Sequence, residues 1–359
     1  MRAPITVYGA TGFTGRLVCG VLARRKVEFR MAGRDEDKLR RLAGSFGMVA
    51  GSSVDIAPLD DADALEDMAS RSRVVLDCAG PFATMGRPVL DACLAAKAHF
   101  LDITGEVDWM IETAGRDAEA KRRKIAAVNA VGFDVIPTDV AAALAAEALG
   151  GKVDRVRIAI CALGARPTQG TTRSLLGILA GGGLSRKDGE IVREKLGAEI
   201  WRVPFPAPIG PRDTMSGPLG DLVTADRTTG ARNIRCFVSL PRRMVGAGRL
   251  ASASLRIPGV RPIIERWVRT LPEGPSASAR KRAVCAAFAE CSGKNGTRSA
   301  WLALGDAYEF TAESAALAAI LASSEGFTAT GALSPVQAFG VRPLLDGLSP
   351  FGVTSGVTA

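Results

Sequence analysis

Three glycines near the start of the chain have the spacing that suits phosphate binding. The segment ITVYGATGFTGRLV places Gly9, Gly12 and Gly15 between an apolar run and an amphipathic stretch. The first glycine permits a tight turn, the second lets the backbone approach a pyrophosphate, and the third lets helix and strand pack closely. The N–H groups and the dipole at the helix start attract the anion. An ordinary glycine-rich turn is the alternative, but the position between strand and helix favours a dinucleotide site. Its predicted residues are Gly9, Ala10, Thr11, Gly12, Phe13, Thr14 and Gly15.

The end of the second predicted strand bears on which dinucleotide is bound. NAD proteins carry an acid there for the ribose 2′-hydroxyl, whereas an arginine accommodates the 2′-phosphate of NADP. This chain has Gly33 and Arg34 at that place, and the planar guanidinium suits a phosphate. The residues therefore favour NADPH. The alternative is that Arg34 is a solvated surface charge and Asp35 caps the next helix.

Further cofactor contacts are expected where the fourth and fifth predicted strands end. The carboxyl ends of parallel strands face the cofactor crevice of a doubly wound sheet. Glu106, which follows them, either borders the substrate or compensates the charge at a helix start. The expected cofactor residues are Ala79, Gly80, Pro81, Thr104 and Gly105.

Two side chains are candidates for acid–base chemistry. The phenol of Tyr308 can donate a proton to a developing carbanion or enolate, although a buried, hydrogen-bonded tyrosine is the commoner structural role at such a corner. Asp134 follows the sixth predicted strand, where it either orients the substrate or holds a bend between domains.

Other catalytic groups are scarce in this sequence. His99 is the only histidine and begins a strand, so it enters the sheet at the end opposite the expected site. This argues against Ser-His-Asp, Cys-His and zinc mechanisms. Cys78 is interpreted as a small buried apolar group. The remaining chemistry is hydride transfer, in which the nicotinamide carries the reactive atom and no metal is expected.

The elements that must position these residues alternate between strand and helix from Ile5 to Gly132. This pattern is typical of a parallel sheet covered by helices, and it predicts an α/β fold with a Rossmann-type doubly wound sheet. The expected strands are Ile5 to Tyr8, Val27 to Ala32, Met48 to Gly51, Val74 to Ala79, His99 to Thr104 and Ile125 to Val131. The expected helices are Arg16 to Arg24, Asp35 to Ala43, Asp61 to Ser70, Gly86 to Ala96 and Val107 to Arg123.

The pattern changes after a further helix, Thr138 to Leu149, whose cap is expected near Thr138 or Asp139. A strand is expected over Val153 to Cys161, and two more flank the KNG turn that ends at Gly296. These features predict a second, α+β domain with an antiparallel sheet. A helix over Glu313 to Ser323 precedes the tail. The predicted domains are 1–137 for NADP binding, 138–322 for the substrate, and a segment 323–359 that returns to the first domain.

Composition limits the class of protein. With 359 residues, 47% of them hydrophobic, the chain can bury a full core. Seven cysteines without a CxxC pair suit a reducing compartment, and no apolar run reaches the roughly 18 to 20 residues of a membrane span. We expect a cytoplasmic protein, at most peripheral to a membrane.

The net charge of +9 raises the question of a nucleic-acid partner. Basic residues are spread along the chain and aromatic residues are 5%, so anionic cofactors and substrates account for the excess and no nucleic acid is expected. The segment Arg242 to Leu271 is predicted to present a basic, partly apolar surface to an acidic carrier protein or a membrane. An ordinary solvated helix is the alternative.

Nine motifs occur in order along the chain: GATGFTG, AGR, DCAGPF, HFLDITGE, VGFDVIPTD, GTTRS, EGPSASAR, GDAYEFTAESAAL and TGALSPVQAFG. Taken together they resemble saccharopine dehydrogenase-like oxidoreductases, and among them the bacterial trans-acting enoyl reductases. The resemblance implies a dinucleotide domain, an inserted substrate domain with a mixed sheet, and NADPH as hydride donor. The stretch from Arg202 to Arg243 departs from the pattern.

Three functions are compatible with these residues. The first is NADPH-dependent reduction of a conjugated C=C bond in a lipid or polyketide-like substrate, free as a small molecule or bound to an acyl carrier. The second is reduction of an amino-acid imine, as in saccharopine formation. The apolar, Gly- and Pro-rich middle of the chain favours an acyl chain over a charged imine. The third is a catalytically silent NADPH-binding regulatory or interaction protein. The oligomeric state and the natural substrate stay open.

Overall fold

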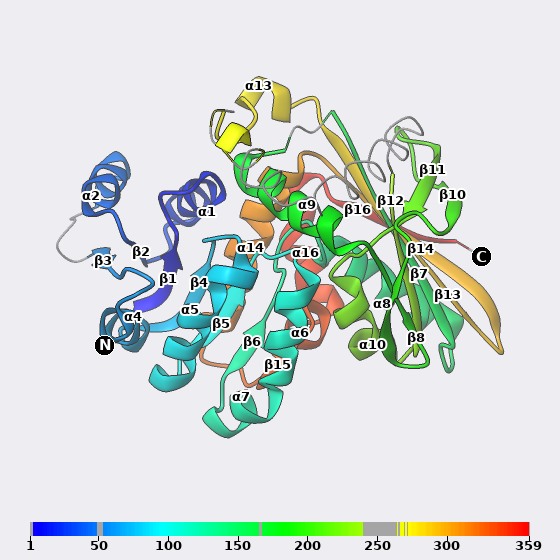
Figure 1. Ribbon diagram of the computed structural model, residues 1–359, viewed down its shortest axis with the longest axis horizontal. Coiled ribbons are helices and arrows are strands. Elements are labelled where there is room, and N and C mark those ends of the chain that lie inside the picture. The colour runs from blue at the N-terminus through cyan, green and yellow to red at the C-terminus, as the bar shows by residue number, and fades with distance from the viewer. Residues whose placement is uncertain are drawn as a thin grey trace. The chain divides into compact units, whose positions relative to one another are not determined.

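The chain forms two compact units, each built on its own sheet (Figure 1). The computed structural model describes residues 3–48, 53–164, 167–239, 264, 266–268, 270 and 272–358. The first unit comprises Met1–Thr104, Asp108–Phe133 and Tyr308–Leu348. The second comprises Gly105–Val107, Asp134–Ala307 and Ser349–Ala359. The domain bounds given by the sequence stay a prediction.

The first unit contains a seven-stranded parallel sheet in the order β15-β6-β5-β4-β1-β2-β3. The strand order reverses between β1 and β4, which is where doubly wound sheets bind ligands. The predicted Rossmann-type fold is therefore confirmed. The strands are β1 (Ala3–Tyr8), β2 (Phe29–Gly33), β3 (Val54–Ile56), β4 (Ser72–Asp77), β5 (His99–Asp102), β6 (Ala126–Val128) and β15 (Gly331–Leu333).

Helices cover this sheet and bury its apolar strands on both faces, as expected for parallel strands. One core cluster joins Val75 and Phe100 of the sheet to Leu90 and Trp109 of the helices. The predicted helix Val107 to Arg123 is in fact two, because Gly115 ends the first of them. The helices are α1 (Phe13–Arg24), α2 (Glu36–Ser45), α4 (Ala62–Ser70), α5 (Phe82–Ala96), α6 (Val107–Gly115), α7 (Asp117–Arg123), α14 (Ala307–Ser323), α15 (Pro335–Phe339) and α16 (Val341–Leu348).

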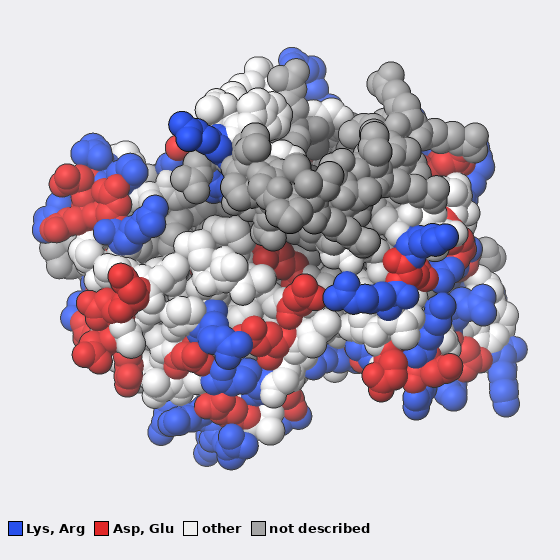
Figure 2. Space-filling model, in the orientation of Figure 1, with Lys and Arg blue, Asp and Glu red and all other residues white. Residues whose placement is uncertain are grey.

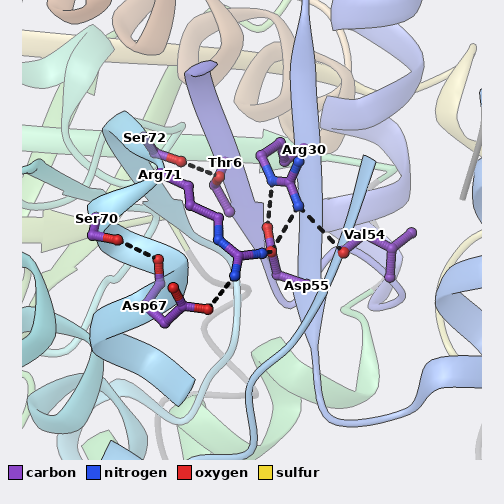
Figure 3. Close-up of polar contacts among 8 residues, drawn as sticks. All are labelled: Thr6, Arg30, Val54, Asp55, Asp67, Ser70, Arg71 and Ser72. Carbon is purple, nitrogen blue, oxygen red and sulfur yellow. Dashed lines mark hydrogen bonds and ion pairs between the residues drawn. The ribbon is translucent and has the colours of Figure 1, made fainter. Parts of the chain in front are cut away.

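The third strand of this sheet lies at Val54–Ile56, whereas most of the strand predicted over Met48 to Gly51 falls outside the described residues. Met48 is outside any strand, and residues 49–52 lie outside the described part of the chain. Asp55 of β3 is buried and accepts a hydrogen bond from Arg30 Nε at 2.6 Å and another from Arg71 Nη1 at 3.0 Å (Figure 3). Because a charged residue lies at the centre of so short a strand, the strand has no apolar pattern to predict it. Its pairing with β2 and the burial of Asp55 depend on partners distant in sequence.

The last part of the chain contributes to both sheets. Strand β15, which the sequence analysis did not predict, pairs in parallel with β6. Strand β16 (Thr354–Thr358) pairs instead with β14 in the second unit. Helix α14 begins at Ala307, six residues before the predicted start at Glu313.

The second unit contains a nine-stranded mixed sheet, as the sequence predicted. Its main path is β10-β11-β12-β7-β13-β14-β16, and β8 pairs with β12 and β9. Only β12 and β7 pair in parallel among the described pairs of this sheet. The predicted hairpin is β13 and β14, with a φ of 97° at Gly296. Besides β16, the strands of this sheet are β7 (Arg155–Leu163), β8 (Gly183–Lys187), β9 (Glu190–Glu194), β10 (Ile200–Pro204), β11 (Pro211–Ser216), β12 (Asn233–Val238), β13 (Val284–Gly293) and β14 (Gly296–Leu304).

Helix α8 (Ile136–Leu149) packs on this sheet and begins earlier than predicted. Its cap residue is Val135, so the expected cap at Thr138 or Asp139 was wrong. Pro137 in the first turn needs no N–H partner there, and the Thr138 hydroxyl donates to Val135 O at 2.8 Å. The other helices of this unit are α9 (Gln169–Gly181), α10 (Asp221–Thr229), α13 (Ala277–Arg280) and the 3₁₀ helix Ser349–Phe351.

The charged surface bears on the question of partners. Figure 2 shows Lys and Arg interspersed with Asp and Glu over the described part of the face in view. Within the described residues, no helix is long and apolar enough to cross a bilayer. Of the predicted basic surface at Arg242 to Leu271, nearly all residues lie outside the described part of the chain, so that hypothesis stays a prediction.

His99 has a structural role at the amino end of β5. Its Nδ1 accepts a hydrogen bond from Ala126 N at 3.0 Å, which requires a neutral ring with the proton on Nε2. The ring meets Phe327 edge-on at 5.0 Å between centroids, and Phe327 stacks on Phe339. Burial lowers the pKa of His99 from its ordinary value. The ring therefore contacts both β6 and the segment that leads from Phe327 to β15.

This geometry predicts a pH-dependent contribution to stability. Because the pKa of His99 is lower in the folded state, the unfolded chain takes up a proton first as the pH falls below about 6.5. Relative to a His99→Gln variant, the wild-type protein should lose stability as the pH is lowered from 7 to 5. Urea unfolding of both proteins over that range measures the difference, in which the other titrating groups cancel. Parallel stability curves would contradict it.

Candidate dinucleotide-binding site

The glycine loop adopts a turn that larger residues cannot form. Gly9 has a φ of 70°, and a Cβ built on it would lie 2.9 Å from the Cβ of Ala79. A Cβ on Gly15 would lie 2.4 Å from Gly9 O, so this glycine sets the close packing of α1 on the loop. Gly12 is the cap residue of α1, and its N–H donates to Gly9 O at 3.0 Å. Gly9 and Gly15 thus have the turn and packing roles that the spacing predicted, and the approach of a pyrophosphate to Gly12 stays a prediction.

The other loop residues frame this turn. Ala10 is buried, and Thr11 O accepts a hydrogen bond from Arg16 Nη1 at 2.6 Å. Phe13 and Thr14 form the half-buried first turn of α1. The side chain of Arg16, a residue of α1, thus holds the loop in place through this hydrogen bond.

Two helices begin next to this loop without a side-chain cap. Gly12 before α1 and Pro81 before α5 supply no capping hydrogen bond, and neither helix has an acidic residue in its first turn. Helices α2 and α4 of the same unit are instead capped by the side chains of Asp35 and Asp61. An uncapped helix start attracts anions because its first N–H groups and its dipole are not compensated. The arrangement fits the phosphates of a dinucleotide.

Arg34 is exposed after β2, and the described residues give it no hydrogen bond or ion pair. Gly33 O before it accepts from Ala57 N at 2.9 Å, and Ala57 O accepts from the Tyr8 hydroxyl at 2.9 Å. Burial, followed by the charge of Asp77, raises the pKa of Tyr8, while the charge of Arg34 opposes the rise. Hydrogen bonds therefore fix the backbone at this corner, and the guanidinium is left available to a phosphate.

Two aspartates that the sequence analysis missed turn the chain at the edge of the sheet. Asp77 ends β4 and Asp102 ends β5, and the two are in register. Asp77 Oδ1 accepts from Ala79 N at 2.8 Å, and Asp102 Oδ1 accepts from Thr104 N at 3.1 Å. The signal was present as the repeated pattern DCAG and DITG. Because each aspartate bends the chain, the strands end before Ala79 and Thr104, where they were predicted to end.

Asp102 is the more heavily bonded of the two. Besides Thr104 N, it accepts from Ala130 N at 2.8 Å, Trp109 Nε1 at 2.7 Å and Asn129 Nδ2 at 2.7 Å. Burial raises its pKa to about 6, and these hydrogen bonds oppose the rise. Ala130 has a φ of 58°, so β6 ends at Val128 and not at Val131 as predicted.

The two acid–base candidates lie in different units. Tyr308, half-buried at the start of α14, meets the Phe13 ring edge-on at 5.4 Å in the first unit. Asp134 belongs to the second unit, where a Cβ on Gly105 would lie 2.8 Å from its Oδ2. Burial raises the pKa of Asp134 to about 6. Glu106, also in the second unit, accepts a hydrogen bond from the Ser174 hydroxyl at 2.9 Å.

The cysteine at the loop after β4 is not activated. Burial, with the charge of Asp77 adding to it, raises the pKa of the Cys78 thiol well above its ordinary value. A thiol in such surroundings stays protonated and is a poor nucleophile. Among the described residues, no group of three or more His, Cys, Asp or Glu side chains could hold a metal ion.

The fold of the first unit defines a Rossmann-type dinucleotide-binding class. Residues 5–129 match the Saccharopine dehydrogenase NADP binding domain family, which confirms the resemblance drawn from the motifs for this part of the chain. The family's NADP binding agrees with the predicted cofactor.

Named relatives share this part of the chain. A saccharopine dehydrogenase-like oxidoreductase from Homo sapiens is 32% identical over 151 residues, which are 38% of this chain and 35% of that protein. A trans-acting enoyl reductase from Mycobacterium ulcerans is 36% identical over 141 residues, 38% of this chain and 33% of that protein. The matches thus span about a third of each relative's length.

A solved structure matches the fold of the whole chain. Saccharopine dehydrogenase (L-Glu forming) from Saccharomyces cerevisiae has a TM-score of 0.65 and covers 99% of both chains at 14% identity. Likeness at this identity shows the fold, and one fold hosts many reactions.

The glycine loop leads to a paired prediction on α1. Gly15→Ala should lower the free energy of unfolding by about 1–3 kcal/mol, because its Cβ would strike backbone that cannot move aside. Gly20→Ala on the same helix should raise it by about 0.5–1 kcal/mol, since the nearest atom to its Cβ is Arg24 Nη1 at 3.7 Å. Urea unfolding compares the two variants. Equal stability would show that the loop has room at position 15.

Proposed function

We propose that the protein is an NADPH-dependent oxidoreductase that reduces a conjugated C=C bond in a lipid-like or polyketide-like substrate, free or bound to an acyl carrier. The observation that carries the cofactor half of the proposal is the glycine loop beside two uncapped helix starts, with Arg34 unpaired among the described residues. The named enoyl reductase relative supports the C=C half.

The binding residues divide by the part of the cofactor they hold. Residues 9–15 and the start of α1 hold the pyrophosphate, and Ala79, Gly80 and Pro81 line its other side at the start of α5. Arg34, next to Gly33, pairs with the 2′-phosphate through its planar fork. Thr104 and Gly105, which follow β5, also contact the cofactor. When bound, NADPH supplies the hydride, and the protein supplies orientation and electrostatics.

A proton must also reach the substrate after the hydride. Tyr308 is our candidate donor, because its phenol is only partly buried and its ring lies against Phe13 of the glycine loop. Asp134 is our candidate for orienting the substrate, since burial holds its pKa near 6 and lets it serve as donor or acceptor near neutral pH. Monitoring NADPH oxidation with enones, acyl-carrier enoyl thioesters and imines tests the reaction type, and no turnover with any substrate would leave a silent NADPH-binding protein.

Cofactor preference is tested at Arg34. Replacing Arg34 with Ala should weaken NADPH binding by about 2 kcal/mol and leave NADH nearly unchanged, because only the 2′-phosphate meets the guanidinium. Titration calorimetry with both cofactors measures this. Arg123→Ala, an exposed arginine at the end of α7, is the charge-matched control. Equal losses for NADPH and NADH would remove Arg34 from the phosphate site.

The proton donor is tested at Tyr308. Tyr308→Phe keeps the ring against Phe13 and removes only the hydroxyl, so NADPH affinity should hold while turnover falls by about 10²-fold or more. Single-turnover kinetics with the best substrate of the panel separates the two quantities. Unchanged turnover would assign the proton to water.

A further inference from the structure

The turn that follows β4 packs against one side of the glycine loop, and the side chain of Asp77 holds this turn in place. Ala79 lies so close to Gly9 that a Cβ on that glycine would be 2.9 Å from both the Cβ and the N of Ala79. Cys78 N donates to Tyr8 O at 2.9 Å, which ties the start of the same turn to β1. Ala79 N donates to Asp77 Oδ1 at 2.8 Å. The position of this turn therefore depends on the carboxyl group of Asp77.

The two oxygens of Asp77 have unequal surroundings. The side chain is fully buried, and Oδ2 has no hydrogen-bond partner in the described part of the chain. Asp102, its register partner on β5, is equally buried but accepts four N–H groups over its two oxygens. A buried carboxylate needs several donors to hold its charge, and Asp77 has one. The two aspartates of the repeated D-x-x-G pattern thus differ in the charge they can carry.

We propose that Asp77 is a positioning residue that works as a neutral carboxylic acid, seating the Ala79–Pro81 turn against the glycine loop so that the dinucleotide phosphates meet no negative charge there. This inference rests on the proposed binding of NADPH. An ionised Asp77 at the same place would repel the phosphates through a medium of low dielectric constant. A neutral acid keeps the acceptor for Ala79 N and adds no charge.

The groups around Asp77 support the neutral form. Burial raises the pKa of Asp77 well above its ordinary value; the bond from Ala79 N opposes the rise, and the charge of Asp102 adds to it. Among the described residues, Tyr8, Cys78 and Cys93 are also coupled to Asp77, and none of these three carries a positive charge. Burial and the charge of Asp102 therefore favour the proton of Asp77, and the N–H of Ala79 opposes it.

The experiment measures the dissociation constant of NADPH between pH 6 and 9.5 for the full chain and three variants. Asp77→Asn retains an acceptor for Ala79 N and resembles the neutral acid, so it should bind NADPH as the wild type does at neutral pH. Asp77→Ala should bind on the order of tenfold more weakly, since Ala79 N loses its partner. At alkaline pH the wild type should bind NADPH more weakly as Asp77 loses its proton. The affinity of Asp77→Asn should not fall in this way.

Asp102→Asn is the matched change at the other D-x-x-G turn, and it should lower the melting temperature because an amide cannot accept four N–H groups. Melting curves of all variants separate folding from binding. Equal loss of NADPH affinity in Asp77→Asn and Asp77→Ala, or wild-type affinity in both, overturns this inference alone. Failure of the folded wild-type protein to bind NADPH overturns the proposed function, and this inference with it.

Discussion

A buried carboxylate that accepts four N–H groups fixes the carboxyl edge of the first sheet. Asp102 draws together the end of β5, the first turns of α6 through Trp109, and the residues after β6 through Asn129 and Ala130. Such a charge is stable without a cation because its hydrogen bonds replace the lost water. Removing any one donor would leave a buried charge less well solvated, so these segments keep their places together.

The edge that Asp102 fixes is also the edge at which we propose that the dinucleotide phosphates bind. Helices α1 and α5 start there without side-chain caps, whereas Asp35 and Asp61 cap the helices farther along the sheet. The capped helices have satisfied their own N–H groups and offer little to a ligand. The other two helices have neither a capping side chain nor an acidic residue in the first turn, so the positive end of the helix dipole is not compensated there. The preference for phosphates that we propose thus depends on the absence of a capping side chain and of an acidic residue at these two helix starts.

Long-range pairs join this edge to the rest of the first unit. Glu313 of α14 is buried and accepts from Arg24 Nη2 at 2.9 Å and Arg25 Nη2 at 2.7 Å at the far end of α1. Thr311 of the same helix accepts from Phe133 N at 3.0 Å. Helix α14 therefore holds both the helix that starts at the glycine loop and the chain that leaves β6. Its distance in sequence from these partners explains why periodicity alone did not place it.

The sequence by itself determined the alternation of strands and helices, the turn at Gly9 and the close packing at Gly15, because local dihedral preferences and residue size decide these features. It also carried the position of Arg34 after β2 and the mixed second sheet with its hairpin at Gly296. Only the tertiary structure decided that β3 holds a buried Asp55, that β15 completes the first sheet, and that Asp77 and Asp102 differ in the charge they can carry. Each of these depends on partners distant in sequence, and the free energy of burying a carboxyl group is set by how many donors the fold brings to it.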